Sequence, residues 1–88
     1  MFHKVKSVNV FDKDKLIIQF IEGTTKIYDV SNLIKKYESF KPLKDNQILF
    51  NSVIVDQGGY GIIWNEEIDI SSNELFDNGI DECNFEKK

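Results

Sequence analysis

Along the first third of the chain, hydrophobic positions recur at every second residue, which is the period of a β-strand. The alternation predicts a first strand around Val8 and Val10, a second over residues 16–21 and a third over 25–30. The charged residues 12–15 separate the first strand from the second, and the turn Glu22-Gly23-Thr24 separates the second from the third. Both faces of the second strand are mostly apolar, so we expect this strand to be central or covered on two sides.

A helix is predicted directly after the third strand. Asp29 and Ser31 stand where a helix N-cap belongs, and the apolar residues that follow fall on one helical face. Pro42 predicts the end of this helix, because the residue before a proline disfavours the helical backbone region. Residues 48–50 are apolar, but the pattern does not decide between helix and strand there.

The second half of the chain alternates again. Val53 and Val55 predict a fourth strand, a glycine-rich turn follows, and residues 60–70 continue in extended form. The series Ser71-Ser72-Asn73-Glu74 is a capping box that opens a short last helix. The order βββ-α-ββ(β)-α, with two short helices, predicts an α+β domain with a mainly antiparallel sheet. We expect a single domain over residues 5–77, followed by an acidic C-terminal tail over 78–88.

Charge divides the chain into two parts. Residues 1–64 hold nine lysines and seven acids, a net charge of +2, whereas residues 65–88 hold two lysines and eight acids, a net charge of −6. The acidic end has two interpretations, a solvated and partly disordered tail or a segment that folds onto a basic partner. All eleven basic residues are lysine, so bidentate guanidinium recognition of phosphate or guanine is excluded. Direct nucleic-acid binding is therefore not expected.

The order of several short segments resembles a bacterial family of small domains, domain-of-unknown-function family 2442. The resemblance spans roughly residues 5–77 and rests on Leu16-Ile17-Ile18-Gln19-Phe20, Glu22-Gly23, Tyr28-Asp29-Val30-Ser31-Asn32-Leu33, Phe40-Lys41-Pro42-Leu43, Leu49-Phe50, Ile63-Trp64-Asn65, Ile68-Asp69-Ile70-Ser71 and Glu74-Leu75-Phe76.

The resemblance implies a modest set of expectations. The family has no established enzymatic activity and no accepted catalytic residues, so none is carried over to this chain. Its members are often predicted to be antitoxin-like partners encoded beside another small protein. Some members carry an additional helix-turn-helix DNA-binding domain, which residues 78–88 are too few to form.

Few side chains are candidates for chemistry. Glu66, Glu67 and Asp69 are the densest carboxylates, and oxygen ligands at this spacing suit a hard cation. A solvated rim together with acids at a helix entry is the better explanation of these carboxylates, because the glycine and the further oxygen ligands of a calcium-binding loop are absent. His3 is the only histidine, and we expect it to be an exposed terminal side chain. Cys83 lies among acids, which disfavour its thiolate. We predict no catalytic residue, metal site or cofactor.

A protein-binding surface is the better-supported expectation. Ile17 and Ile21 lie on the second face of the hairpin strand, which a homodimer or a different protein would cover. Aromatic residues anchor interfaces, so Trp64 has two interpretations, a core side chain or an interface anchor. The candidate surface consists of Ile17, Ile21, Tyr60, Trp64, Ile80 and Phe85.

Two classes of function follow from these candidates. The first is a cytoplasmic interaction module that binds another protein, which we expect to be basic, toxin-like and genetically paired with this one. The second is a small cation-dependent enzyme that uses Glu66, Glu67 and Asp69. No stretch of the sequence is apolar enough to span a membrane, and a single cysteine suits a reducing compartment.

Overall fold

The chain folds into two antiparallel sheets and several short helices, and the computed structural model describes residues 3–82. The strands within this range are β1 (Val5–Asp12), β2 (Lys15–Phe20), β3 (Thr25–Asp29), β4 (Ile54–Val55), β5 (Gly61–Asn65), β6 (Ile68–Ser71) and β7 (Ile80–Asp81). The α-helices are α1 (Ser31–Lys36), α2 (Pro42–Asp45), α3 (Gln47–Asn51) and α4 (Ser72–Asn78), and 3₁₀ turns cover Glu38–Phe40 and Gln57–Gly59.

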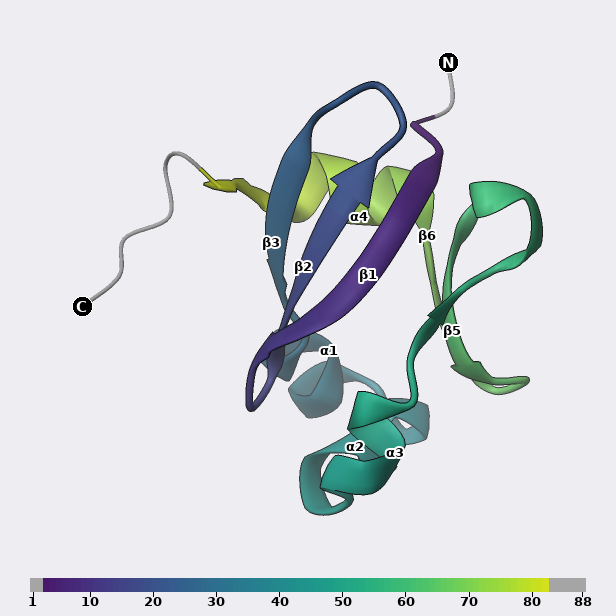
Figure 1. Cartoon of the computed structure of the whole chain (residues 1–88). Helices are drawn as coiled ribbons and strands as arrows, with labels where there is room; N and C mark the ends of the chain where they lie inside the picture. The colour runs from purple at the N-terminus through teal and green to yellow at the C-terminus, as the bar shows by residue number, and fades with distance from the viewer. Residues whose placement is uncertain (1–2, 83–88) are drawn as a thin grey trace.

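The larger sheet has the strand order β1-β2-β3-β7, and the smaller sheet has the order β4-β5-β6. All pairings are antiparallel, which confirms the predicted α+β class. The second strand is central, as its two apolar faces predict. The two sheets meet where β1 lies beside β4 and β5 (Figure 1).

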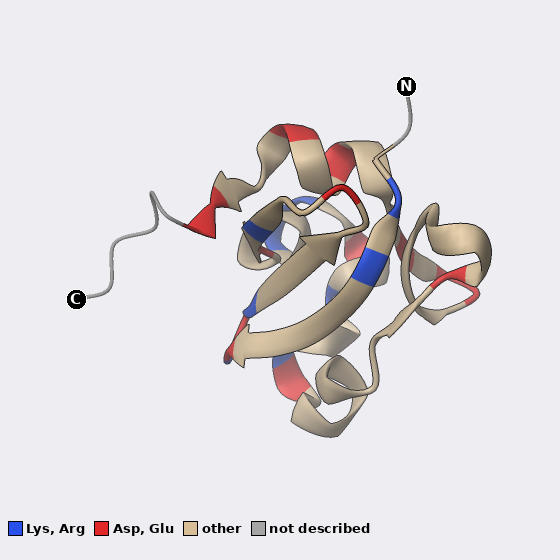
Figure 2. Ribbon diagram, turned by 45° about the horizontal axis from the view of Figure 1, so that its top comes forward, with Lys and Arg blue, Asp and Glu red and all other residues tan. Residues whose placement is uncertain are grey.

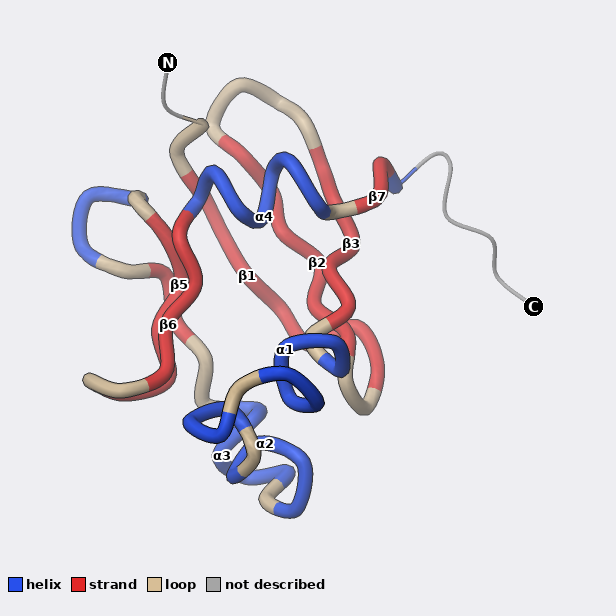
Figure 3. The backbone as a smooth tube through the Cα atoms, turned by 180° about the vertical axis from the view of Figure 1, so that it is seen from behind, coloured by secondary structure: helices blue, strands red, loops and turns tan. Residues whose placement is uncertain are grey.

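The main core lies on one face of the larger sheet. In β2, Leu16, Ile18 and Phe20 point to this face and are almost fully buried, as the alternation predicts. Helix α4 crosses the same face, and α1, α2 and α3 gather at one end of the sheet (Figures 1 and 3). The remaining fully buried core side chains come from these layers and from the smaller sheet: Val30, Phe50, Ile62 and Leu75.

The last helix begins where the capping box predicts. The Ser71 hydroxyl oxygen accepts a hydrogen bond from the Glu74 amide at 3.2 Å, so one of the unpaired amides of the first turn is satisfied. The helix ends before Gly79, where a Cβ would lie only 2.5 Å from the Leu75 carbonyl oxygen. The glycine therefore allows the chain to turn back and form β7.

The prediction of two helices was wrong, because residues 3–82 contain four α-helices. The single helix predicted to end at Pro42 ends at Lys36, and two further helices, α2 and α3, follow it. Tyr37 adopts an extended conformation (φ −117°, ψ 129°), which stops α1. Pro42 is instead the first residue of α2, a position where its missing amide costs nothing. The segment of undecided type, residues 48–50, belongs to α3. The break at Tyr37 lets both Phe40 and Phe50 reach the core.

Smaller differences concern the ends of elements. The Asp29 carboxylate accepts hydrogen bonds from the Ser31 amide at 2.9 Å and the Ser31 hydroxyl at 2.6 Å, so Asp29 supplies the oxygen that prepares α1, while Ser31 lies inside the helix. The fourth strand contains Val55 but begins after Val53. Residues 78–81, placed in the C-terminal tail by sequence, end α4 and form β7 on β3.

Candidate binding surfaces

The face of the larger sheet opposite α4 carries a row of isoleucines. Register pairs Ile17 of β2 with Ile27 of β3, and Ile27 with Ile80 of β7. Directly paired residues in antiparallel strands share a face, so these three side chains form a continuous row, the isoleucine row. Ile27 is 2% exposed but does not belong to the main core, and Ile80 is 48% exposed. No helix within residues 3–82 packs on this face (Figures 1 and 3).

The row contains two of the six predicted surface residues, Ile17 and Ile80, and adds Ile27, which sequence reasoning missed. The sequence contained a signal for Ile27: Tyr28, the next residue of the same strand, faces the main core, and consecutive strand residues point to opposite faces. Ile21 is 63% exposed in the β2–β3 turn, beyond the paired residues, and Tyr60 is 49% exposed in the turn before β5. Phe85 lies outside the described residues.

Trp64 is a core residue. Its side chain is buried, and its indole Nε1–H donates a hydrogen bond to the Phe50 carbonyl oxygen at 3.0 Å. Its ring contacts Phe50 at 6.0 Å and Phe40 at 6.3 Å between ring centroids. Of the two interpretations of Trp64, the core interpretation is therefore the one that the structure bears out.

Acidic residues are concentrated in the segment of the chain that contains Ile80, the exposed end of the isoleucine row. Residues 72–82 contain four acids and no lysine, and Figure 2 shows them along α4 and at β7. Two of them are engaged, because Glu74 accepts the Tyr28 hydroxyl hydrogen at 2.7 Å and Asp81 pairs with Lys26 at 2.9 Å. Asp77 and Glu82 form no ion pair within residues 3–82. Both side chains are exposed, and they lie two or three residues from Ile80 in sequence.

The Tyr28–Glu74 bond makes the stability of the fold sensitive to alkaline pH. Burial, reinforced by this hydrogen bond, raises the pKa of the Tyr28 phenol above its usual value of 10.0. A raised pKa favours the neutral phenol in the folded state, so its stabilisation is complete below pH 10 and is lost as pH rises toward the folded-state pKa. We expect the Tyr28 contribution to fall by about 1 kcal/mol between pH 10 and 11. This change is measured by urea unfolding of the wild-type protein and of Tyr28→Phe at pH values of about 10 and 11. Equal pH dependence in the two proteins would contradict the assignment.

The carboxylates of the alternative hypothesis, a cation site, are not brought together in the part of the chain that the structure describes. Glu66 and Glu67 are exposed in the β5–β6 turn, where the Asn65 side-chain oxygen accepts hydrogen bonds from the amides of Glu67 and Ile68 at 2.8 and 3.0 Å. Asp69 is exposed on β6. No group of three or more acidic, histidine or cysteine side chains within residues 3–82 is placed to hold a metal ion. All three carboxylates are exposed, which is consistent with the preferred interpretation of a solvated rim.

His3 is better packed than the expected exposed terminal side chain. Its ring stacks on Phe76 with ring centroids 3.5 Å apart, and its Nδ1 lies 2.9 Å from a Glu22 carboxylate oxygen. It joins the N-terminal segment to α4 and to the β2–β3 turn, which is a structural role. Cys83 lies outside the described residues.

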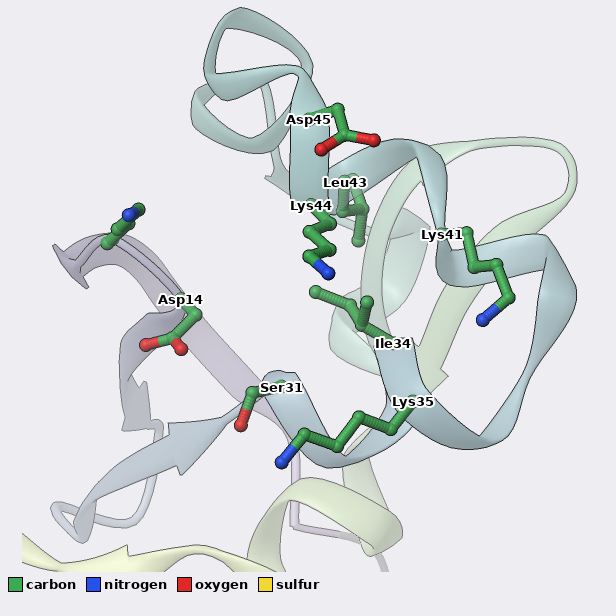
Figure 4. A pocket seen from close by; sticks show the side chains of 9 residues that line it. Asp14, Ser31, Ile34, Lys35, Lys41, Leu43, Lys44 and Asp45 are labelled. Carbon is green, nitrogen blue, oxygen red and sulfur yellow. The ribbon is translucent and has the colours of Figure 1, made fainter.

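A second candidate surface is a hollow of about 700 Å³ between the β1–β2 turn and helices α1 and α2 (Figure 4). Four lysines from three separate segments line it: Lys13, Lys35, Lys41 and Lys44. The side chains of Ile34 and Leu43 form its apolar part, and Asp14 and Asp45 lie at its rim. Sequence reasoning did not find this hollow, because only the packing of α1 and α2 against the hairpin brings the lysines together.

Comparison with models of known protein families gives a match. A family model described as "Protein of unknown function (DUF2442)" matches residues 5–81, which is most of the 88-residue sequence. The chain belongs to this family. The DUF2442 match includes β7, so the paired strand that sequence reasoning placed in the tail lies inside the family domain. No curated protein and no solved structure matches the chain.

None of the helices within residues 3–82 combines the length and apolarity needed to cross a bilayer.

Proposed function

We propose that this DUF2442 protein is an interaction module that binds another protein through the outer face of its larger sheet. The observation that carries the proposal is the exposed end of the isoleucine row: Ile80 on the edge strand β7 is 48% exposed, whereas Ile17 is half-buried and Ile27 is buried. Interfaces concentrate their binding energy in a few apolar anchors surrounded by a polar rim. Ile80, flanked in sequence by the acidic residues of α4 and β7, fits this arrangement.

The charge of the rim supports a basic partner. Asp77 and Glu82 lie two or three residues from Ile80 in sequence and carry charges that no lysine within residues 3–82 neutralises. Opposite charges at a rim speed association and disfavour partners of the same charge. A partner with an apolar patch edged by lysine or arginine would complement this surface. A genetically paired, toxin-like protein encoded beside this one is the partner class that the family suggests.

The test is coexpression of the tagged protein with the product of the neighbouring gene, followed by measurement of the dissociation constant. We expect Ile80→Asp to weaken binding about 30-fold or more, which is the loss typical of an interface anchor. The matched control is Ile48→Asp, since Ile48 is an 84%-exposed isoleucine on α3, away from the isoleucine row. Circular dichroism establishes that both variants keep the wild-type fold.

Two results would overturn the proposal. Equal binding by the two aspartate variants would exclude the isoleucine row as the binding surface. Light scattering tests whether a second copy of this chain covers the face. A wild-type homodimer that Ile80→Asp converts to a monomer would show that the face binds a second copy and not a different protein.

A further inference from the structure

The lysine-lined hollow is an unusual concentration of positive charge on an acidic protein. Residues 31–45, which include α1 and α2, hold four lysines and two acids, a net charge of +2, although the whole chain has a net charge of −4. The hairpin turn adds Lys13 from the opposite side. The side chain of Lys44 extends toward the space between Asp14 and Ile34, and that of Lys35 extends toward Ser31 (Figure 4).

The four lysines have no ion-pair partner among the residues that the structure describes. Within residues 3–82, ion pairs involve Lys15, Lys26 and His3, and none involves Lys13, Lys35, Lys41 or Lys44. The Asp14 carboxylate at the rim is already paired with Lys15 at 3.2 Å. Asp45 is the one remaining carboxylate in the lining, so cations outnumber free anions there. Cations gathered at one concave surface create a positive potential that attracts anions.

The hollow also has the size of a small-molecule site, with a lining that is mostly charged. Its volume of about 700 Å³ lies within the range of ligand pockets, roughly 300–1,000 Å³. Ile34 and Leu43 offer apolar contacts to the body of a ligand, and ammonium groups act as point charges that accept either phosphoryl or carboxylate oxygens.

We propose that this hollow binds a small molecule that carries at least two separated negative charges, phosphoryl or carboxylate, on a body about the size of a nucleotide. The site shares no residue with the isoleucine row, so it stands or falls independently of the protein-binding function. The β1–β2 turn lies on one side of the hollow, and α1 and α2 lie on the other. A bound anion would therefore connect these segments.

The test is an NMR titration of the ¹⁵N-labelled protein at constant ionic strength with three probes: pyrophosphate, citrate and metal-free ATP. We expect saturable shifts of the amides of residues 13–14 and 31–45. Lys35→Ala and Lys44→Ala should each weaken binding about two- to fivefold, as removal of one exposed ion pair does. The matched control is Lys6→Ala, because Lys6 is an exposed lysine of β1 outside the hollow. Raising the salt concentration from about 50 to 200 mM should weaken binding further.

The outcomes separate the ligand classes and decide the proposal. Saturation by pyrophosphate and ATP alone would identify a phosphoryl site, and saturation by citrate alone a carboxylate site; both support it. Absence of saturable shifts with every probe at about 10 mM would overturn it. Equal binding by wild type, Lys6→Ala and the Lys35→Ala/Lys44→Ala double variant would also overturn it, since the shifts would then come from elsewhere on the surface. Thermal unfolding followed by circular dichroism checks that each variant is folded.

Discussion

Replacing Trp64 with alanine is expected to lower the free energy of unfolding by about 3–5 kcal/mol, the usual cost of removing a large aromatic side chain from a core. The substitution empties the space between Phe40 and Phe50 and removes the indole donor, which leaves the Phe50 carbonyl oxygen without this 3.0 Å hydrogen bond. The total stability of a domain of this size is only about 5–15 kcal/mol, so the variant should be close to unfolded at physiological temperature. Urea unfolding followed by far-UV circular dichroism measures the effect, because the substitution removes the only tryptophan fluorophore.

The matched control for Trp64 is Ile48→Ala. Ile48 is 84% exposed on α3, and exposed substitutions usually change stability by no more than about 0.5 kcal/mol. A loss below about 1 kcal/mol for Trp64→Ala would contradict the core position and would return Trp64 to the candidate interaction surface.

Gly61→Ala should destabilise the smaller sheet by about 3 kcal/mol, the upper part of the range for overpacking a filled site. Gly61 pairs with Ser71 between β5 and β6, and an added Cβ would lie 2.4 Å from the Ile70 carbonyl oxygen. That neighbour is backbone of the paired strand, so the overlap is relieved only by moving one strand away from the other. Urea unfolding gives the free energy, and amide hydrogen exchange should show the largest loss of protection in β5 and β6.

Gly23→Ala is the appropriate comparison for Gly61. Gly23 lies in the β2–β3 turn with φ +107°, a conformation that side chains disfavour, but nothing lies within 4 Å of its added Cβ. We therefore expect a cost of about 1 kcal/mol from the backbone conformation alone. If Gly61→Ala were no more destabilising than Gly23→Ala, the close approach of β5 and β6 would not be a packing constraint.

The two proposed binding surfaces differ in charge as well as in position. The isoleucine row is bordered in sequence by acids of α4 and β7, whereas the hollow between the hairpin turn and α1–α2 is lined by four lysines. A small domain can therefore present an apolar, acid-rimmed face to a protein and a cationic hollow to an anionic ligand. Because the two surfaces share no residue, variants at Ile80 and at Lys35 or Lys44 test them separately.

Local patterns in the sequence were sufficient for elements whose signals lie within a few neighbouring residues. The inward set Leu16, Ile18 and Phe20 follows from the two-residue period of a strand, and the start of α4 follows from the Ser71 cap. The family assignment also came from the order of short segments, and the DUF2442 match over residues 5–81 confirms it.

Only the tertiary structure decided the features that depend on residues far apart in the chain. The break of α1 at Tyr37 has no strong local signal, and it is the burial of Phe40 and Phe50 that makes it favourable. Likewise, β7 is two residues long and is defined only by its pairing with β3. Strand pairing is a long-range event, and the sequence pattern of an isolated pair of residues does not encode it.

The candidate surfaces divide in the same way. Alternation in β2 by itself determined that Ile17 points away from the main core, but the pairing of three strands placed Ile27 and Ile80 beside it. The convergence of Lys13 with Lys35 and Lys44, twenty or more residues away, depended entirely on the docking of α1 and α2 against the hairpin. The sequence by itself determined which side chains each element presents, because side-chain direction is a local property of the backbone. Which of those side chains became neighbours was decided by the burial of apolar surface between elements, a property of the whole chain.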